Sequence, residues 1–161
     1  MSAIYLHNDL DAYLLRNWLE SELADKYYNE LMALDWQTER LSMFGKSITV
    51  PRKIAWFADG GLNYRYSGVD HIGQPMPNSL EWIKARLQDD NIGEFNACLA
   101  NLYSTGNDYM GWHSDNEPSL GVHPTIASIS IGEARDFVFK HQNSSQKISI
   151  KLYHGDLLVM F

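Results

Sequence analysis

Apolar residues recur at intervals of three and four positions in two stretches of the chain, and this spacing predicts helices there. Residues 9–33 show the spacing over their whole length, and Asp9 is a candidate N-cap at the start. Residues 79–88 place their leucine and isoleucine positions on one face, with Ser79 as the candidate cap. We therefore expect an N-terminal helical segment over residues 1–35 and a second, shorter helix.

Apolar and polar residues alternate through much of the remaining chain, which is typical of strands. Residues 36–68 combine this alternation with glycine-containing turns and predict short hairpins, whereas residues 69–78 carry two prolines and predict a loop. Five further strands are expected at 95–103, 125–131, 136–140, 147–152 and 156–161. Many short strands separated by turns favour a mostly β (α+β) domain, either a sandwich or a jelly roll.

Composition narrows the class of protein. A chain of 161 residues fits a single domain over 1–161, and no apolar run is long enough to cross a membrane. Cys98 is the only cysteine, and no signal peptide is evident, so we expect an intracellular protein, cytoplasmic in a bacterium or nuclear in a eukaryote. The net charge is -7, yet residues 36–53 are locally basic. That strip is either a phosphate-binding surface or a solvated loop.

The pair His113-Ser-Asp115 is the main candidate for chemistry. Two residues apart on an extended strand, an imidazole and a carboxylate point to the same side and reach one ion. A histidine from another strand would complete the two-histidine, one-carboxylate triad of non-haem iron oxygenases. The chain also contains His154-Gly-Asp156, which we interpret as a turn before the last strand, with Gly155 supplying the turn. His154 is therefore disfavoured as the third ligand.

The surroundings of the first pair resemble the AlkB family of iron(II)- and 2-oxoglutarate-dependent dioxygenases, which remove alkyl groups from nucleic-acid bases. The similar segments are Asn101-Leu-Tyr103, Asp108 to Glu117, Ile126 to Phe139 and His154 to Met160. Further segments, at Met43 to Lys46, Pro51 to Lys53 and Tyr64 to Gly68, are similar to the branch that acts on duplex DNA. The resemblance implies a double-stranded β-helix (jelly roll) with N-terminal helices packed on it, and Fe(II), 2-oxoglutarate and O2 as cofactors.

The resemblance also implies roles for single residues. His113 and Asp115 would bind iron, and Asn101 and Tyr103 would donate hydrogen bonds to 2-oxoglutarate. Judged by residue type alone, a structural role is favoured, in which Asn101 ends a strand and Tyr103 packs in the core. The spacing of the two residues ahead of His113 reverses that preference.

Residues 36–68 would form the nucleotide-recognition hairpins of the family. The implied contacts with the flipped base come from Tyr64, Tyr66, Asn116 and Glu117, with Tyr66 stacking on the base opposite His113. Met43, Phe44 and Gly45 would form the finger that enters the duplex and offsets the cost of base extrusion. Arg52 and Lys53 would contact phosphates. Ordinary packing of Phe44 and Tyr66 remains an alternative.

The sequence departs from the family at its end. Family members continue with another histidine, the third iron ligand, and with two arginines, whereas this sequence stops at Phe161. It is therefore either a fragment or a natural truncation. The leading hypothesis is a monomeric oxidative demethylase of 1-methyladenine and 3-methylcytosine in alkylated DNA, or in RNA, without a membrane partner. The alternatives are an inactive binder of damaged nucleic acid and an unrelated metal-binding jelly roll that uses His113, Asp115 and His154.

Overall fold

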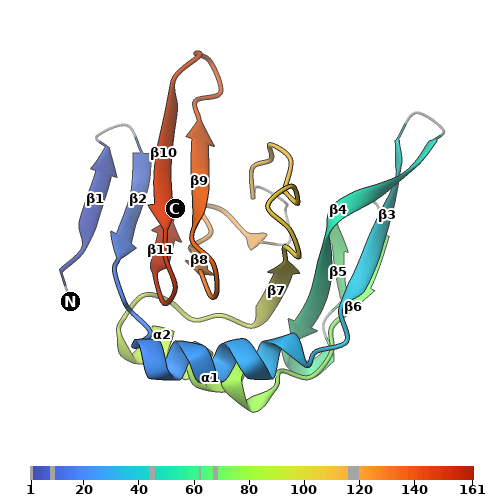
Figure 1. The fold of residues 1–161 in the computed structure, drawn as a ribbon, viewed down its shortest axis with the longest axis horizontal. Helices are drawn as coiled ribbons and strands as arrows, with labels where there is room; N and C mark the ends of the chain where they lie inside the picture. Colours follow the sequence, from blue (N-terminus) through green and yellow to red (C-terminus); the bar gives the residue numbers. More distant parts are fainter. Residues whose placement is uncertain (1, 8–9, 44–45, 62, 67–68, 116–119) are drawn as a thin grey trace. The chain divides into compact units, whose positions relative to one another are not determined.

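The computed structural model describes residues 2–7, 10–43, 46–61, 63–66, 69–115 and 120–161; within 41–48 and 61–72 it describes the backbone alone. The chain divides into two compact units, one formed by residues 1–32 with 123–161 and the other by residues 33–122 (Figure 1). The first unit contains β1 (Ile4–His7), β2 (Leu10–Leu15), α1 (Ser21–Met32), β8 (Ile126–Ile129), β9 (Arg135–Lys140), β10 (Lys147–Leu152) and β11 (Leu157–Met160). The second contains β3 (Gln37–Met43), β4 (Lys46–Ala58), the 3-10 turn Asp59–Gly61, β5 (Asn63–Tyr66), β6 (Val69–Ile72), α2 (Asn78–Asp89) and β7 (Ala97–Leu102). The expected mostly β class is confirmed.

The first unit is built from two antiparallel layers that share one core. Four strands form a sheet in the order β1-β2-β11-β8, and β9 pairs with β10 in a separate hairpin. Buried side chains from both layers meet in one cluster: Ala12, Leu14, Ile150, Leu152 and Leu158. Because each strand turns alternate residues inward, the apolar positions that predicted the C-terminal strands contribute Ile150, Leu152 and Leu158 to this core.

The N-terminal helix is shorter than the sequence predicts. Residues 10–15, expected to be helical, form β2 and pair with β11, and only α1 confirms the helical prediction. Ala12 and Leu14 are buried, whereas Asp11 is exposed and Tyr13 between the two buried residues is only half-buried, which is the alternation of a strand. Leucines and tyrosines so closely spaced fit either period, and pairing with β11 decides between them. Asp9, the candidate cap, lies outside the described residues.

Two smaller expectations also need correction. The segment 69–78 is not a loop throughout, because Val69–Ile72 forms β6 and pairs with β5. Helix α2 has Pro77 at its N-cap position and no side-chain cap, so Ser79 is not the cap but a buried residue of the first turn. The five strands expected after residue 95 are confirmed as β7 to β11, with shifts of a residue or two at most of their ends.

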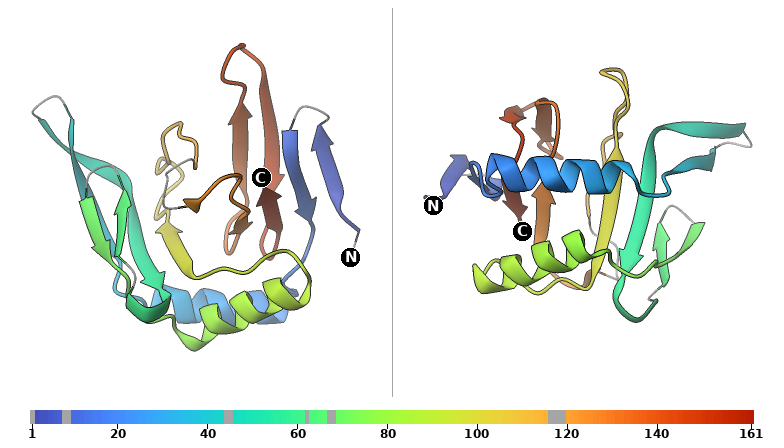
Figure 2. Two further views of the ribbon diagram at one scale, coloured as in Figure 1. Left: turned by 180° about the vertical axis from the view of Figure 1, so that it is seen from behind. Right: turned by 60° about the horizontal axis from the view of Figure 1, so that its bottom comes forward.

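The second unit is organised around the long central strand of its sheet. The three-stranded sheet has the order β3-β4-β7 (Figure 2). Its central strand, β4, runs for 13 residues. The register of β3 on β4 shifts between Thr38 and Arg40, so Glu39 lies at a β-bulge. Bulges redirect side chains locally and are common beside functional sites.

Among the described residues, no helix has the length and apolar character needed to cross a membrane.

Gly155 is a position where glycine is required. Its φ of 83° lies in the left-handed region, and a Cβ there would overlap the backbone carbonyl oxygen of Leu19. The same two residues are joined by a hydrogen bond of 3.0 Å from the Leu19 N–H to the Gly155 carbonyl. The close approach of the two backbones thus fixes the turn between β10 and β11.

We expect Gly155→Ala to lower the free energy of unfolding by about 2 kcal/mol, because it adds a steric overlap to an unfavourable φ. Gly106→Ala is the matched control, since a Cβ at Gly106 meets nothing within 4 Å. Urea unfolding of both variants measures the difference. A Gly155 variant as stable as the control would contradict the assignment.

Candidate metal and cofactor site

The loop that follows β7 is held in place by Asp108. Its carboxylate accepts hydrogen bonds from the backbone N–H groups of Ser104 (2.7 Å) and Thr105 (3.3 Å) and from the Thr105 hydroxyl (2.9 Å). The N–H of Tyr109 then donates to the Pro51 carbonyl at 3.0 Å, which ties the loop to β4. The segment that carries His113 therefore leaves this sheet from a fixed point.

His113 and Asp115 lie with their polar atoms facing one another. The Nε2 atom of His113 is 3.4 Å from Oδ1 of Asp115, and both side chains are about one-third exposed. The expectation that the two side chains lie on the same side is confirmed. The expectation that they lie on a strand is wrong, because residues 113–115 belong to no strand or helix.

The groups around the His113 ring indicate which of its two nitrogen atoms carries the proton. Nδ1 of His113 is 2.8 Å from the Gly111 carbonyl, which only accepts, so Nδ1 carries the proton. In the neutral ring Nε2 then presents a lone pair toward a carboxylate. Two acceptors at this distance are stabilised by a cation between them, or by a second proton on the imidazole. Metal-bound histidines typically donate their other ring N–H to a carbonyl in this way.

The spacing of the two atoms fits a shared ion. Nitrogen and oxygen ligands lie about 2.1 Å from a first-row metal ion, so two ligands of one ion are at most about 4.2 Å apart. The 3.4 Å between Nε2 of His113 and Oδ1 of Asp115 is within this limit. Within the described ranges, no group of three or more histidine, cysteine or acidic side chains is placed to hold a metal.

The second histidine–aspartate pair has a structural role. Asp156 is buried, forms an ion pair with Arg16 and accepts hydrogen bonds from the N–H groups of Asn17 and Tyr153. The Nδ1 atom of His154 accepts a hydrogen bond of 2.9 Å from the Gly132 N–H. On the other side of the ring, Nε2 of His154 is 3.3 Å from Oδ1 of Asp25. The interpretation of His154-Gly-Asp156 as a turn is confirmed.

Asn101 lies on β7 and is held from the neighbouring strand. It pairs in register with Ile54 of β4, and its side-chain oxygen accepts a hydrogen bond of 2.7 Å from Nε of Arg52. Tyr103, two residues along and just past the end of β7, is half-buried. Residues two apart on a strand share a face, so the expectation that Asn101 and Tyr103 serve one ligand is consistent with the backbone.

Arg52 does not lie where a phosphate contact requires it. Its side chain is 4% exposed, and its NH2 group is 3.4 Å from a carboxylate oxygen of Glu39. A guanidinium enclosed by a carboxylate and an amide is not presented to a phosphate backbone, so we no longer assign it that contact. Lys53, the adjacent residue on the other face of β4, is exposed, and its phosphate contact stays a prediction.

Several predicted base-binding residues fall outside the description. Phe44, Gly45, Asn116 and Glu117 are not among the described residues. Met43, Tyr64 and Tyr66 are described by their backbone alone, at the end of β3 and in β5. Their contacts with a flipped base or a duplex remain predictions, including the stacking of Tyr66 opposite His113.

Cys98 on β7 is a partly buried thiol whose burial raises its pKa to about 11, from an ordinary value of 9.0. Both the folded and the unfolded chain keep the proton below pH 9. As the pH rises from 9 to 11, the unfolded chain loses it first, so the folded state loses stability over that interval.

At pH 8 we expect iodoacetamide to alkylate Cys98 about 100-fold more slowly in the folded protein than in urea, because the thiolate is the nucleophile. Mass spectrometry follows the reaction without ambiguity, since the chain has one cysteine. Equal rates in the two states would contradict a buried, protonated thiol.

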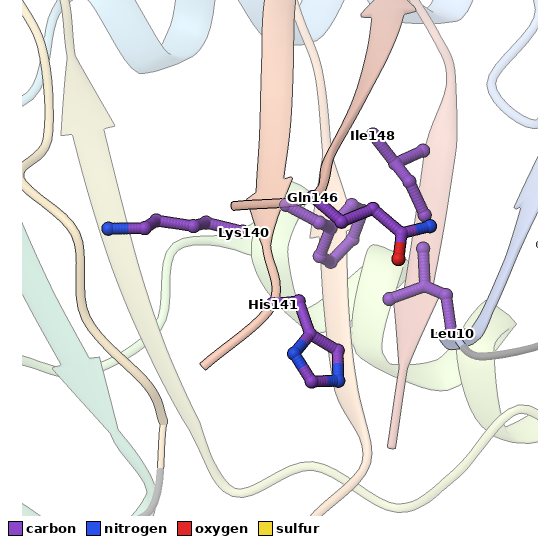
Figure 3. A pocket seen from close by; sticks show the side chains of 6 residues that line it. Leu10, Lys140, His141, Gln146 and Ile148 are labelled. Carbon is purple, nitrogen blue, oxygen red and sulfur yellow. The ribbon is translucent and has the colours of Figure 1, made fainter. Parts of the chain in front are cut away.

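A shallow hollow in the first unit lies apart from these residues. It is lined by Leu10, Phe139, Lys140, His141, Gln146 and Ile148, at the end of the β9–β10 hairpin where the turn joins the two strands (Figure 3). The lining is mainly apolar and contains no carboxylate. As far as the chain is described, none of the predicted metal, cofactor or base-binding residues lines it, so we assign it no part in the site.

The sequence is similar to known oxygenases over most of its length. The model of the 2OG-Fe(II) oxygenase superfamily matches residues 11–161. DNA oxidative demethylase ALKBH2 of Mus musculus is 37% identical over 85% of this chain and 62% of its own length, and that of Homo sapiens is 39% identical over 85% and 57%. Alpha-ketoglutarate-dependent dioxygenase alkB homolog 3 of Homo sapiens is 38% identical over 68% of this chain and 41% of its own length. The solved structure of OsALKBH1 superposes with a TM-score of 0.60 at 14% identity, covering 99% of this chain and 82% of that one.

The chain therefore belongs to the 2OG-Fe(II) oxygenase superfamily. Within it the chain is of the AlkB type, so the resemblance drawn from its motifs is confirmed. Family membership implies Fe(II), 2-oxoglutarate and O2 as cofactors. The chain spans between two-fifths and about three-fifths of the length of these curated relatives.

Proposed function

We propose that this protein is an oxidative demethylase of alkylated nucleic-acid bases, dependent on Fe(II) and 2-oxoglutarate. The observation that carries the proposal is the distance of 3.4 Å between Nε2 of His113 and Oδ1 of Asp115. The other ring nitrogen of His113, Nδ1, is 2.8 Å from the Gly111 carbonyl oxygen, which leaves Nε2 as the ligand atom. Identities of 37–39% to the ALKBH2 relatives support a nucleic-acid substrate. We propose alkylated DNA, with RNA as the further possibility, and 1-methyladenine and 3-methylcytosine as the lesions.

The fold that goes with this function is a double-stranded β-helix. The two layers with a shared core in the first unit support it, as does the likeness to OsALKBH1 at a TM-score of 0.60. That the chain is one domain over 1–161, that it is a monomer and that it acts inside the cell stay predictions.

In this scheme, His113 and Asp115 hold the iron, which supplies the oxidising chemistry when bound. The Gly111 carbonyl keeps the proton on Nδ1 of His113, so that Nε2 is the ligand atom. Asn101 and Tyr103 donate hydrogen bonds to 2-oxoglutarate, which offers only acceptors. The protein thus binds and orients the reactants while the cofactors carry out the oxidation.

The base-binding part of the scheme rests on residues of the second unit. Tyr66 stacks on the extruded base, Tyr64 lines its pocket, and Asn116 with Glu117 bonds its edge. A cationic methylated base suits an aromatic ring beside carboxylates. The finger of Met43, Phe44 and Gly45 enters the duplex, and Lys53 contacts phosphate. Extrusion costs a few kcal/mol, which an inserted apolar side chain offsets.

An assay with a methylated oligonucleotide tests the proposal. The protein is incubated with Fe(II), 2-oxoglutarate and an oligonucleotide carrying one 1-methyladenine, and succinate and unmodified adenine are both quantified. We expect the two products in equal amounts, and loss of both when iron or 2-oxoglutarate is omitted. Succinate formed equally with unmethylated oligonucleotide would refute the assigned substrate. Tight binding of the methylated oligonucleotide without either product would favour the inactive binder.

A further inference from the structure

We propose that Arg52 is a positioning residue for 2-oxoglutarate, which acts by fixing the orientation of the Asn101 side-chain amide. The inference rests on the proposed function, in which Asn101 binds 2-oxoglutarate, and assigns Arg52 a role different from the phosphate contact expected from the motif. It depends on three side chains from three adjacent strands, Glu39 of β3, Arg52 of β4 and Asn101 of β7.

The three side chains form a continuous chain of contacts across the sheet. Nε of Arg52 donates to Oδ1 of Asn101 at 2.7 Å, and the NH2 group of Arg52 lies 3.4 Å from Oε2 of Glu39. The side chains of Arg52 and Glu39 are 4% and 3% exposed. Asn101 is half-buried at the end of this series, so it is the member that a ligand reaches.

The chemistry of the guanidinium determines which way the amide faces. An amide can present either its oxygen or its NH2 group in nearly the same space. A guanidinium has only donors, so the Asn101 atom that faces Nε of Arg52 must be the oxygen. The NH2 group of Asn101 is thereby turned to the other side. Carboxylate and keto oxygens of 2-oxoglutarate only accept, so this is the orientation that binds them.

Glu39 in turn keeps the guanidinium in place. The β-bulge at Glu39 interrupts the regular pairing of β3 with β4 where Arg52 lies. A buried arginine is stable only when its charge is compensated, and the Glu39 carboxylate provides that compensation. A charge-assisted hydrogen bond to Asn101 is also stronger than one between neutral groups, which favours one amide orientation over the other.

The test replaces Glu39 and Arg52 in the same variant and measures the binding of 2-oxoglutarate under conditions without turnover. The double variant Glu39→Met with Arg52→Met leaves no isolated buried charge. Binding of 2-oxoglutarate in the presence of Mn(II) is measured by calorimetry, and thermal unfolding verifies the fold. We expect affinity to fall about tenfold, the loss of one oriented hydrogen bond. Arg40→Met, at an exposed position on β3, is the control with unchanged affinity.

Asn101→Ala separates failure of the inference from failure of the proposed function. If the inference holds, Asn101→Ala also weakens binding, and adding the pair substitution to it causes no further loss. Two outcomes would overturn the role of Arg52 and leave that of Asn101 in place. In the first, the losses of 2-oxoglutarate affinity from the pair substitution and from Asn101→Ala are additive. In the second, the pair variant binds 2-oxoglutarate with wild-type affinity while Asn101→Ala binds it more weakly. Wild-type affinity in Asn101→Ala would overturn the role of Asn101 and, with it, the inference. Weaker oligonucleotide binding at unchanged 2-oxoglutarate affinity would restore the phosphate contact.

A second measurement does not depend on the ligand or on tolerance of the double substitution. Arg52→Lys keeps a positive charge beside Glu39 but loses the planar Nε donor. NMR spectroscopy of the ligand-free protein gives the chemical shifts of the Asn101 side-chain Cγ and NH2 group. We expect these shifts to change in Arg52→Lys and to remain unchanged in Arg40→Lys. Unchanged Asn101 resonances in Arg52→Lys would overturn the proposal.

Discussion

Replacing Asp115 with alanine is expected to weaken Fe(II) binding at least 100-fold and to abolish demethylation. The variant leaves Nε2 of His113 as the one ligand of this pair, and a single imidazole binds a divalent ion weakly. Anaerobic titration with Fe(II), or calorimetry with Mn(II), measures the affinity. Asp35→Ala is the matched control, because Asp35 is exposed in the second unit and carries no proposed role.

The metal assignment also predicts the effect of removing the histidine of the pair. His113→Ala is expected to lose affinity to the same extent as Asp115→Ala. Retention of full metal affinity in either variant, with an intact fold, would remove this pair from the metal site.

The single substitution Arg52→Met is expected to destabilise the fold by about 3–5 kcal/mol. It removes the cationic partner of the Glu39 carboxylate, which is 3% exposed, and so leaves a buried negative charge without that compensation. Urea unfolding followed by circular dichroism measures the loss. The magnitude is a large part of the stability of an ordinary domain, so the variant is also expected to accumulate poorly in cells.

The double variant that also carries Glu39→Met shows whether the uncompensated Glu39 charge causes the loss of stability. It is expected to recover most of the loss, because an apolar pair replaces the ion pair in the same space. Arg40→Met, an exposed arginine on the same strand as Glu39, is expected to change stability by less than about 0.5 kcal/mol. A double variant less stable than Arg52→Met alone would contradict the interpretation.

The C-terminal half of the fold was predictable from the sequence because its strands alternate and its turns carry recognisable residues. Leu152, Leu157 and Leu158 occupy buried positions in the strands expected for them. Gly155 marked a turn before the last strand, and its φ of 83° explains why a glycine stands there. Local pattern and tertiary contacts agree in this region, which is the condition under which sequence-based prediction works.

Residues 10–15 could not be assigned from the sequence alone. Leu10, Tyr13 and Leu14 satisfy a helical period, while Ala12 and Leu14 satisfy that of a strand. The strand conformation of residues 10–15 is determined by pairing with β11, which is more than 140 residues away in the chain. The pairing runs from Leu157↔Leu15 to Met160↔Ala12. A window of local sequence contains no information about such a partner.

The candidate site was predictable by residue type and only partly by environment. The spacing of His113 and Asp115 predicted their proximity, although a loop rather than a strand brings them together. Arg52 was assigned to phosphate by the resemblance of its motif to the AlkB family, and a motif carries no information about the burial of a side chain. The signal that was missed is Glu39, an acidic residue among the alternating positions of β3, whose burial requires a cationic partner.

The length of β4 limits how the β3–β4 hairpin can vary between homologues. One uninterrupted strand of 13 residues begins at the hairpin tip and continues through Arg52 to the pairs with β7. A slip of one residue in its pairing would turn every later side chain to the opposite face. An exchange of hairpin tips between homologues should therefore leave the register shift at Glu39 and the part of β4 from Arg52 onward intact. Tips of different length are then interchangeable without disturbing Arg52 and Asn101, the residues proposed to orient and bind 2-oxoglutarate.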